Sequence, residues 1–143
     1  MTMQDTHVSL AHGNGGRYMR ELIHEIFARH LANPLLDTES DAAVLPWNAA
    51  DGEPAFTTDS FTVQPIEFPG GNIGSLAVHG TINDLAMAGA QPLYLSASFI
   101  LEEGFPLADL QRIAQSMGEA SRGALVPVIT GDSSDPSSRL IVT

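Results

Sequence analysis

The segment from Asn72 to Ala88 constrains the fold more than any other part of the sequence. Its apolar residues fall on nearly every side of a helix: Ile73, Leu76, Ala77, Val78, Ile82, Leu85 and Met87. A helix that lacks a polar face has to be covered by other elements. Asn72 is a suitable N-cap and Gly89 a suitable C-terminal stop, so we expect a deeply buried helix between them.

Two other segments have the one-sided pattern of helices that cover a core. In the first, apolar residues recur at helical spacing from Met19 to Leu31, and Asn33-Pro34 ends the pattern. The second begins at Pro106 and runs to about Arg122. Its inward-facing residues are expected to be Leu107, Leu110, Ile113, Ala114 and Met117.

Short apolar segments that are typical of strands alternate with these helices. We expect strands at Ala42–Leu45, Ala55–Thr58, Leu93–Leu101, Val126–Thr130 and Leu140–Val142. This order of elements predicts one α+β domain over residues 1–143, a mixed sheet covered by helices. A strand at the end of the chain suggests that a continuation or a partner chain ties it down.

Composition excludes several classes of function. The chain has 143 residues, six Arg, no Lys, no Cys and a formal charge of −11. Cysteine nucleophiles, Schiff-base lysines and a Walker-type phosphate lysine are therefore excluded. The acidic balance opposes nucleic-acid binding and favours cations. Neither a signal peptide nor a membrane-spanning stretch is evident, so we expect a cytoplasmic protein without membrane contact.

Three aspartates lie next to expected strands. Asp41 precedes Ala42–Leu45, Asp59 follows Ala55–Thr58, and Asp132 follows the strand that begins at Val126. Because strand ends often build the sites of α/β folds, these carboxylates could share one crevice. Each of them alone could equally be a cap or turn residue.

A fourth aspartate, Asp84, lies within the apolar helix. It is eleven positions after Ile73, which places the two residues within ~20° of each other around the helix. A buried acid must be paired or must hold a metal. Because Lys is absent and Arg is scarce, Mg2+ is the simplest partner for Asp84 and the other three aspartates.

Two glycine segments precede helices. Gly13-Asn14-Gly15-Gly16 and Gly70-Gly71 could offer backbone N–H groups to a phosphate. Ordinary loop geometry explains both segments as well.

Six motifs, taken in order over about residues 9–132, resemble the HypE hydrogenase maturation family. HypE belongs to the superfamily of aminoimidazole ribonucleotide synthetase and selenophosphate synthetase. Those enzymes fit less well, because the stretch Phe99–Gly104 looks specific to HypE. The motifs are Ala11–Gly16, Thr57–Phe61, Phe68–Gly74, His79–Ala86, Leu95–Gly104 and Thr130–Asp132.

The resemblance implies a PurM-like N-terminal domain that binds ATP and Mg2+ and dimerises through its sheet. Its metal ligands would be Asp41, Asp59, Asp84 and Asp132. Its ATP-binding residues would be Gly13, Asn14, Gly15, Gly16, Thr58, Asp59, Gly70, Gly71, Asn83, Asp84, Gly131 and Asp132.

The resemblance also implies a role in NiFe hydrogenase maturation. Family members use ATP to dehydrate a thiocarboxamide on their own C-terminal cysteine. The resulting thiocyanate supplies the cyanide ligands of the iron. The implied partners are a second copy of the chain, the carbamoyltransferase HypF and the HypC–HypD scaffold.

The chain departs from the family pattern in three ways. It contains neither the second domain nor the C-terminal cysteine, and the family's Gly-Asp-Thr-Lys segment reads Gly131-Asp132-Ser133-Ser134. We therefore expect a Mg-ATP-binding domain that is catalytically incomplete as this chain. The alternative is a non-catalytic dimerisation or regulatory module that binds maturation partners.

Overall fold

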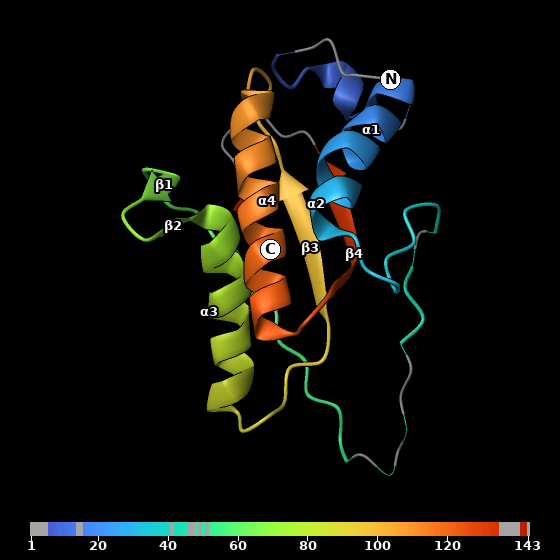
Figure 1. Ribbon diagram of the computed structural model, residues 1–143, viewed down its shortest axis with the longest axis vertical. Coiled ribbons are helices and arrows are strands. Elements are labelled where there is room, and N and C mark those ends of the chain that lie inside the picture. The colour runs from blue at the N-terminus through green and yellow to red at the C-terminus, as the bar shows by residue number, and fades with distance from the viewer. Residues whose placement is uncertain are drawn as a thin grey trace.

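A three-stranded mixed sheet forms one layer of the molecule, with strand order β4–β3–β5. Figure 1 shows two of these strands, β3 and β4, side by side. The computed structural model describes residues 6–13, 16–40, 42–45, 48, 50, 52–134 and 141–142. Strand β3 pairs parallel with β4 and antiparallel with β5. The bounds are Leu95–Ile100 for β3, Val128–Ser134 for β4 and Ile141–Val142 for β5. The α+β class and the mixed sheet predicted from the sequence are confirmed.

The first helix covers one face of this sheet. It begins as α1 (Arg17–Leu22), continues through a π-helical stretch η2 (Ile23–Ala28) and ends as α2 (Arg29–Leu31). A short 3-10 turn, η1 (Leu10–His12), precedes it. Its buried residues are Leu22, Ile26, Phe27 and Leu31. The helix and its end before Asn33-Pro34 are as predicted.

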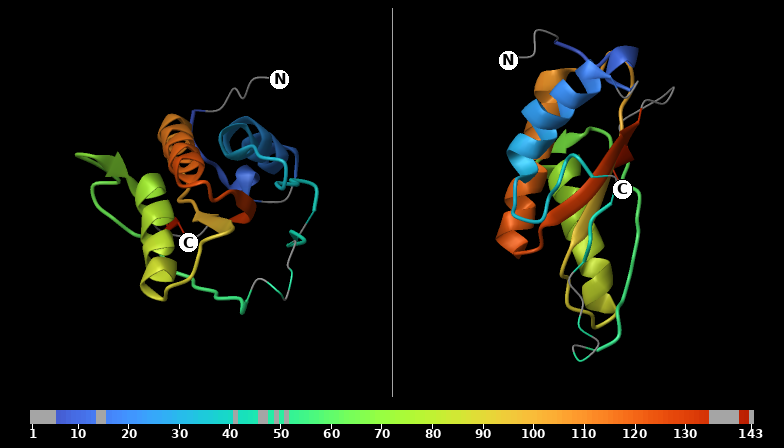
Figure 2. Two further views of the ribbon diagram at one scale, coloured as in Figure 1. Left: turned by 60° about the horizontal axis from the view of Figure 1, so that its bottom comes forward. Right: turned by 90° about the vertical axis from the view of Figure 1, so that its right-hand side faces the viewer.

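Helix α4 (Leu107–Ala124) lies beside the first helix on the same side of β3 and β4 (Figure 2). All five of its residues that were predicted to face inward are buried. Helix α3 (Ile73–Met87) packs against α4. The two helices approach so closely that a Cβ on Gly74 would lie 2.4 Å from the carbonyl oxygen of Ile113. Glycine at position 74 therefore fixes how the helices meet.

Helix α3 has the predicted bounds, but it is not buried on every side. The second half of α3 has an exposed side that includes His79, Asn83, Asp84, Ala86 and Met87. Met87 is 85% exposed. The sequence prediction was wrong here because hydrophobicity around α3 is nearly uniform, so it does not show which side the neighbours cover. Helix α4 and β3 cover the side that includes Ala77 and Val78.

The strands expected at Ala42–Leu45 and Ala55–Thr58 are not formed. Val44 and Phe56 are 93% and 88% exposed. A strand exists only where a neighbouring strand takes up its hydrogen bonds, and within the described residues β4 pairs only with β3. The sequence showed β-like composition, but it could not show whether a partner strand is present.

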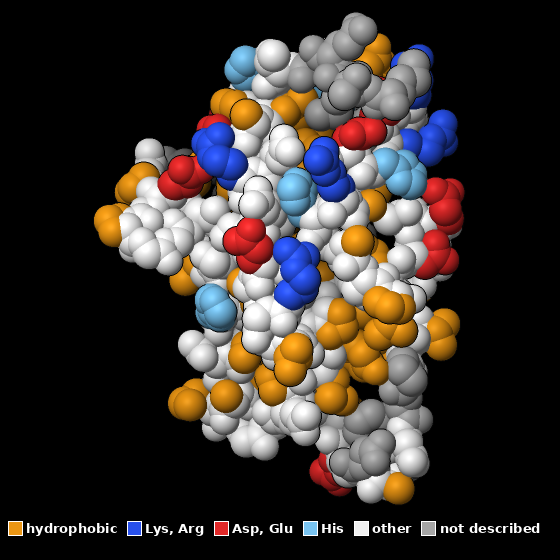
Figure 3. Space-filling view, viewed as in Figure 1, with side chains coloured by type: hydrophobic (Ala, Val, Ile, Leu, Met, Phe, Trp, Pro, Cys, Tyr) orange, Lys and Arg blue, Asp and Glu red, His pale blue; other side chains and the backbone are white. Residues whose placement is uncertain are grey.

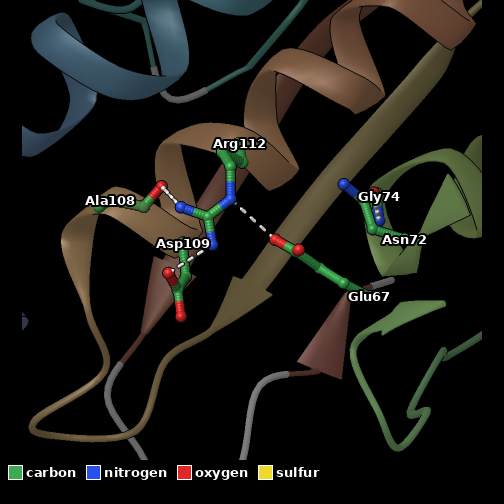
Figure 4. Close-up of polar contacts among 6 residues, drawn as sticks. All are labelled: Glu67, Asn72, Gly74, Ala108, Asp109 and Arg112. Carbon is green, nitrogen blue, oxygen red and sulfur yellow. Dashed lines mark hydrogen bonds and ion pairs between the residues drawn. The ribbon is translucent and has the colours of Figure 1, made fainter.

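A two-stranded hairpin, which the sequence analysis did not predict, precedes α3 instead. Strand β1 (Glu67–Phe68) pairs antiparallel with β2 (Gly71–Asn72). Figure 4 shows how Arg112 of α4 holds this hairpin: its Nε donates to Glu67 at 2.9 Å, and its Nη2 donates to Asp109 at 2.7 Å. These two carboxylates raise the pKa of Arg112 above its usual value. The hairpin is thereby tied to the surface of α4.

None of the helices in the described part of the chain is both long enough and apolar enough to cross a membrane.

Candidate functional site

Asp132 lies on β4, beside a hollow between the first helix and the sheet. The cavity has a volume of about 120 Å3. Apolar side chains such as Ile23, Phe27 and Phe99 form its floor. Its polar lining residues are Asp37, Thr38, Ser40, Thr130, Asp132 and Ser133. A carboxylate at the edge of a hollow of this kind could bind a cation or a polar ligand.

The turn at residues 37–40 brings a second carboxylate to this hollow. The Oδ1 atom of Asp37 accepts a hydrogen bond from the backbone N–H of Glu39 at 2.9 Å, which defines the turn. The sequence prediction missed Asp37, Thr38 and Ser40, although they directly precede Asp41. Asp41 itself lies outside the described residues.

The alternation of β4 decides which side chains can serve this site. A Cβ on Gly131 would lie 2.3 Å from the carbonyl oxygen of Ala97, so glycine lets β4 pair closely with β3. Ser133 is buried, and its hydroxyl donates to the sulfur of Met19 at 3.3 Å. Asp132, between them, is exposed. Successive side chains of a strand alternate in direction. Both residues line the hollow, and the Ser133 hydroxyl is the one directed at Met19 of the first helix.

The other two described aspartates belong to a different part of the molecule. Asp84 lies on α3, and the chain near Asp59 approaches this helix. The ring of Phe61 packs closely on Gly80: a Cβ on Gly80 would lie 2.6 Å from a carbon of the Phe61 ring. The chain around Asp59 therefore approaches the face of α3 that carries Gly80. Asp84 lies four residues further along this helix, on the same face. Thr58, Asp59, Asn83 and Asp84 are all exposed.

The burial predicted for Asp84 is wrong. Asp84 itself is exposed, so its carboxylate is solvated and needs no charged partner. Its alignment with Ile73 was estimated correctly, but the helix is covered over only part of its length. Burial of Ile73 therefore does not extend to Asp84.

The three described aspartates, Asp59, Asp84 and Asp132, do not form one cluster. Among the described residues, no three side chains of Asp, Glu, His or Cys lie close enough together to hold a metal ion. In Figure 1, α3 runs downward and β4 runs upward. The carboxylates thus fall into two groups by the elements they lie near: Asp84 and the chain that precedes Phe61 at α3, and Asp132 with the turn that leads to Asp41.

The hydrogen bonds at the start of α3 are already formed. The Oδ1 atom of Asn72 accepts the N–H groups of Gly74 at 2.9 Å and Ser75 at 3.2 Å. The N–H of Ile73 donates to Ile66 at 2.9 Å. These amides are not available to a phosphate, so any such contact falls to the hairpin itself. Gly70, with φ +96°, gives the hairpin its turn.

The first glycine segment is only partly described. The N–H of Gly13 donates to Leu10 at 3.1 Å, and the carbonyl of Gly16 accepts from Arg20 at 3.2 Å. These glycines close η1 and begin α1. Asn14 and Gly15 lie outside the described residues.

Comparison with known proteins identifies the family. Residues 39–143 match the family model described as AIR synthase related protein, N-terminal domain. The chain belongs to this family. The matched segment includes the mixed sheet, α3 and α4, and Asp41, Asp59, Asp84 and Asp132 all lie within it.

Among curated relatives, the chain resembles carbamoyl dehydratases HypE. It is 56% identical to the HypE of Azotobacter vinelandii over 132 aligned residues. The aligned region covers 92% of this chain and 38% of that protein. The chain thus spans about two fifths of this relative's length.

Solved structures give the same assignment. A hydrogenase maturation protein HypE in complex with ATP matches with a TM-score of 0.88 and 48% identity, over 94% of this chain and 40% of that one. A HypE–HypF complex matches with a TM-score of 0.58 and 45% identity, over 85% of this chain and 39% of that one.

Proposed function

We propose that this chain is a HypE-like domain that binds Mg-ATP in NiFe hydrogenase maturation. The observation that carries the proposal is its similarity, over 94% of its length, to a HypE that was solved in complex with ATP. The family's ATP-dependent dehydration acts on a C-terminal cysteine, and these 143 residues contain no cysteine. The contribution of the domain itself is therefore to bind and orient the nucleotide.

The chemistry of the aspartates fits a magnesium–nucleotide complex. Asp59, Asp84 and Asp132 are exposed, and none of them forms an ion pair with another described side chain. Their oxygens are hard ligands of the type that Mg2+ binds. With Asp41, they are the proposed metal ligands, and bound Mg2+ would offset the phosphate charge. The proposed ATP contacts are Gly13, Asn14, Gly15, Gly16, Thr58, Asp59, Gly70, Gly71, Asn83, Asp84, Gly131 and Asp132.

We propose that a second copy of the chain completes the site. Helix α3, which carries Asp84, and strand β4, which carries Asp132, run in opposite directions (Figure 1), so we expect one nucleotide to meet both aspartates only across a dimer. A homodimer that packs through its sheets would bring the two groups of carboxylates together. HypF is a further proposed partner because a related HypE was solved in complex with it. The proposed location is the cytoplasm.

Calorimetric titration of ATP tests the nucleotide site. We expect binding in the presence of Mg2+ and its loss in EDTA. Asp84→Asn should weaken Mg-ATP binding about tenfold or more because it removes a charged ligand of the metal. Glu103→Gln changes an exposed carboxylate that is not among the proposed ligands and serves as the matched control. Unaltered affinity in the folded Asp84→Asn protein would remove Asp84 from the site.

Mixing two defective variants tests the contribution of the second copy. Asp84→Asn and Asp132→Asn should each bind Mg-ATP weakly. If one site takes Asp84 and Asp132 from different copies, co-refolded mixtures should recover about a quarter of the tight sites. Each mixed dimer would then carry one site with both native aspartates. No recovery in mixed dimers would place both residues in the same copy's site.

A second candidate function, a non-catalytic dimerisation or regulatory module, is favoured by one observation. Among the described residues, no three potential metal ligands come together. This candidate requires dimerisation but not nucleotide binding. A folded dimer that does not bind ATP in the presence of Mg2+ would support it over the first.

A further inference from the structure

A second, larger hollow lies where α2 and α4 end. Figure 3 shows hydrophobic side chains gathered over the lower half of the face on which these helices lie. The hollow has a volume of about 420 Å3. We call it the helix-end hollow. Its lining residues are Leu31, Ala32, Asn33, Gly118, Ser121, Arg122, Leu125, Val126 and Pro127. None of the proposed nucleotide ligands lines it, so it is separate from the site described above.

Specific contacts fix the backbone beside the helix-end hollow. A Cβ on Gly118 would lie 2.1 Å from the carbonyl oxygen of His30, so the helices touch at this point. Asn33 donates from Nδ2 to Leu31 at 3.0 Å and to Val128 at 2.7 Å. The end of α2 is thereby fixed to both α4 and the sheet. The residues beside the hollow are therefore held by contacts of Gly118 and Asn33 and do not belong to a loose loop.

Leu125, on the rim, has an unusual backbone conformation. It has φ 59° and ψ 30°, the left-handed region. Its N–H donates to Arg122 and that of Val126 donates to Ser121, both at 3.1 Å, which is the hydrogen-bond pattern of a Schellman motif. The left-handed position of this motif is normally glycine.

Helix α3 of the same chain ends with glycine at the equivalent position. There Gly89, at φ +72°, donates to Ala86 at 3.0 Å, and Ala90 donates to Leu85 at 2.9 Å. Leucine at position 125 costs about 1–2 kcal/mol of backbone strain by comparison. Its side chain is also 87% exposed, which leaves a large apolar group in water. Both features reduce stability, so Leu125 is explained better by a contact with another molecule than by folding.

One cationic side chain lines this hollow, that of Arg122, and its Nη1 donates to the carbonyl of His30 at 2.9 Å. Arg122 forms no ion pair with a described carboxylate. In a chain of net charge −11, an arginine of this kind in an apolar hollow is a local exception.

We propose that the helix-end hollow binds an apolar side chain of a protein partner whose neighbouring residues are carboxylates. The apolar side chain would enter the hollow and cover Leu125. A flanking carboxylate would meet Arg122, the cation that lines the hollow. Contacts of an exposed apolar anchor with a charged rim are typical of protein interfaces.

A pair of peptides tests this proposal by NMR titration without nucleotide. The probe is acetyl-Asp-Leu-Asp-amide, and the matched control is acetyl-Lys-Leu-Lys-amide. We expect the acidic peptide to shift the resonances of Asn33, Ser121 and Leu125, and the basic peptide to leave them unchanged. Equal effects of the two peptides, or shifts confined to other parts of the protein, would overturn the proposal.

Two variants separate the apolar and charged contributions. Leu125→Gly should weaken binding of the acidic peptide about tenfold and also raise the melting temperature, which shows that the fold is intact. Arg122→Gln should reduce the salt dependence of binding. Met87→Gly, which removes an equally exposed apolar side chain on α3, should leave peptide binding unchanged.

Two further outcomes would count against a separate partner. If Leu125→Gly binds the acidic peptide as tightly as the native protein, the apolar anchor is not used. If dilution of the protein alone shifts the same resonances, a second copy occupies the hollow. Neither outcome bears on Mg-ATP binding, which is measured separately.

Discussion

Gly118 is the residue at which α2 meets α4, and it tolerates no side chain. An added Cβ would lie 2.1 Å from the carbonyl oxygen of His30, a backbone atom that cannot move aside easily. Gly118→Ala should therefore lower the free energy of unfolding by about 1–3 kcal/mol. Gly123→Ala is the matched control, because nothing lies within 4 Å of its Cβ position. It should raise stability by about 0.5–1 kcal/mol. Urea denaturation of both variants measures the difference.

His30 should make stability depend on pH. Burial, assisted by Arg29 and Arg122 and opposed by Glu119, lowers the pKa of His30 below its ordinary value. Among the described residues, Nε2 of His30 has no hydrogen-bond partner. The folded protein therefore holds this histidine neutral, whereas the unfolded chain takes up a proton below about pH 6.5. The stability that His30 contributes is present above that pH and is lost as the pH falls.

Denaturation curves at about pH 7.5 and about pH 5.5 check the direction in which stability changes with pH. The free energy of unfolding of the native protein should fall more between these values than that of His30→Gln. His79→Gln alters a histidine that is exposed on α3, so it should keep the native pH dependence. A His30→Gln protein with the native dependence would contradict the assignment.

For single residues, the sequence indicated which side chains could bind a ligand better than it indicated how buried those side chains are. The aspartates were identified from their positions beside strands and on α3. The helix of Asp84 is correct, but Asp132 lies within β4 and not after it, because β4 continues past Thr130 to Ser134. The burial of Asp84 was not predictable, because it depends on how far α4 and the sheet extend along α3. The left-handed backbone conformation of Leu125 was not predictable either, since only the three-dimensional path of the chain reveals its positive φ.

The start of α3 depends on one side chain, that of Asn72. Its Oδ1 accepts two backbone N–H groups, and the residue is buried. Asn72→Ala should cost about 1–2 kcal/mol because two buried donors lose their acceptor. Asn72→Asp retains an acceptor and should cost less. Asn48→Ala removes a similar but exposed turn contact and should cost little. Thermal unfolding of the three variants provides the ranking.

Helices were predicted more accurately than strands, and the reason is physical. The hydrogen bonds of a helix are local, so the spacing of apolar residues and the caps at Asn72 and Gly89 nearly determine where α3 begins and ends. The strand at Leu95–Ile100 was also predicted, because it lies in the centre of the sheet and is apolar. The segments Ala42–Leu45 and Ala55–Thr58 have equally suitable composition. Their pairing depends on residues far away in the sequence, which local composition does not specify.

At the scale of the whole molecule, the same two segments bear on dimerisation. They expose Val44 and Phe56 almost completely, and β4 has one edge without a strand partner among the described residues. Exposed apolar residues next to an open strand edge favour association. The proposed dimer would therefore give these segments the backbone partners that a single copy lacks.

Hydrogen exchange at several protein concentrations tests this expectation. In dilute protein, the amides of residues 55–58 should exchange nearly as fast as those of an unfolded chain. At concentrations where sedimentation shows a dimer, they should become protected about tenfold or more. The amides of α4 should stay protected throughout, because its hydrogen bonds form within one copy. Phe56→Ser should shift the monomer–dimer equilibrium toward monomer and leave α4 unchanged. A protein that dimerises while residues 55–58 remain unprotected would place the interface elsewhere, and the nucleotide site would then need another way to bring Asp84 and Asp132 together.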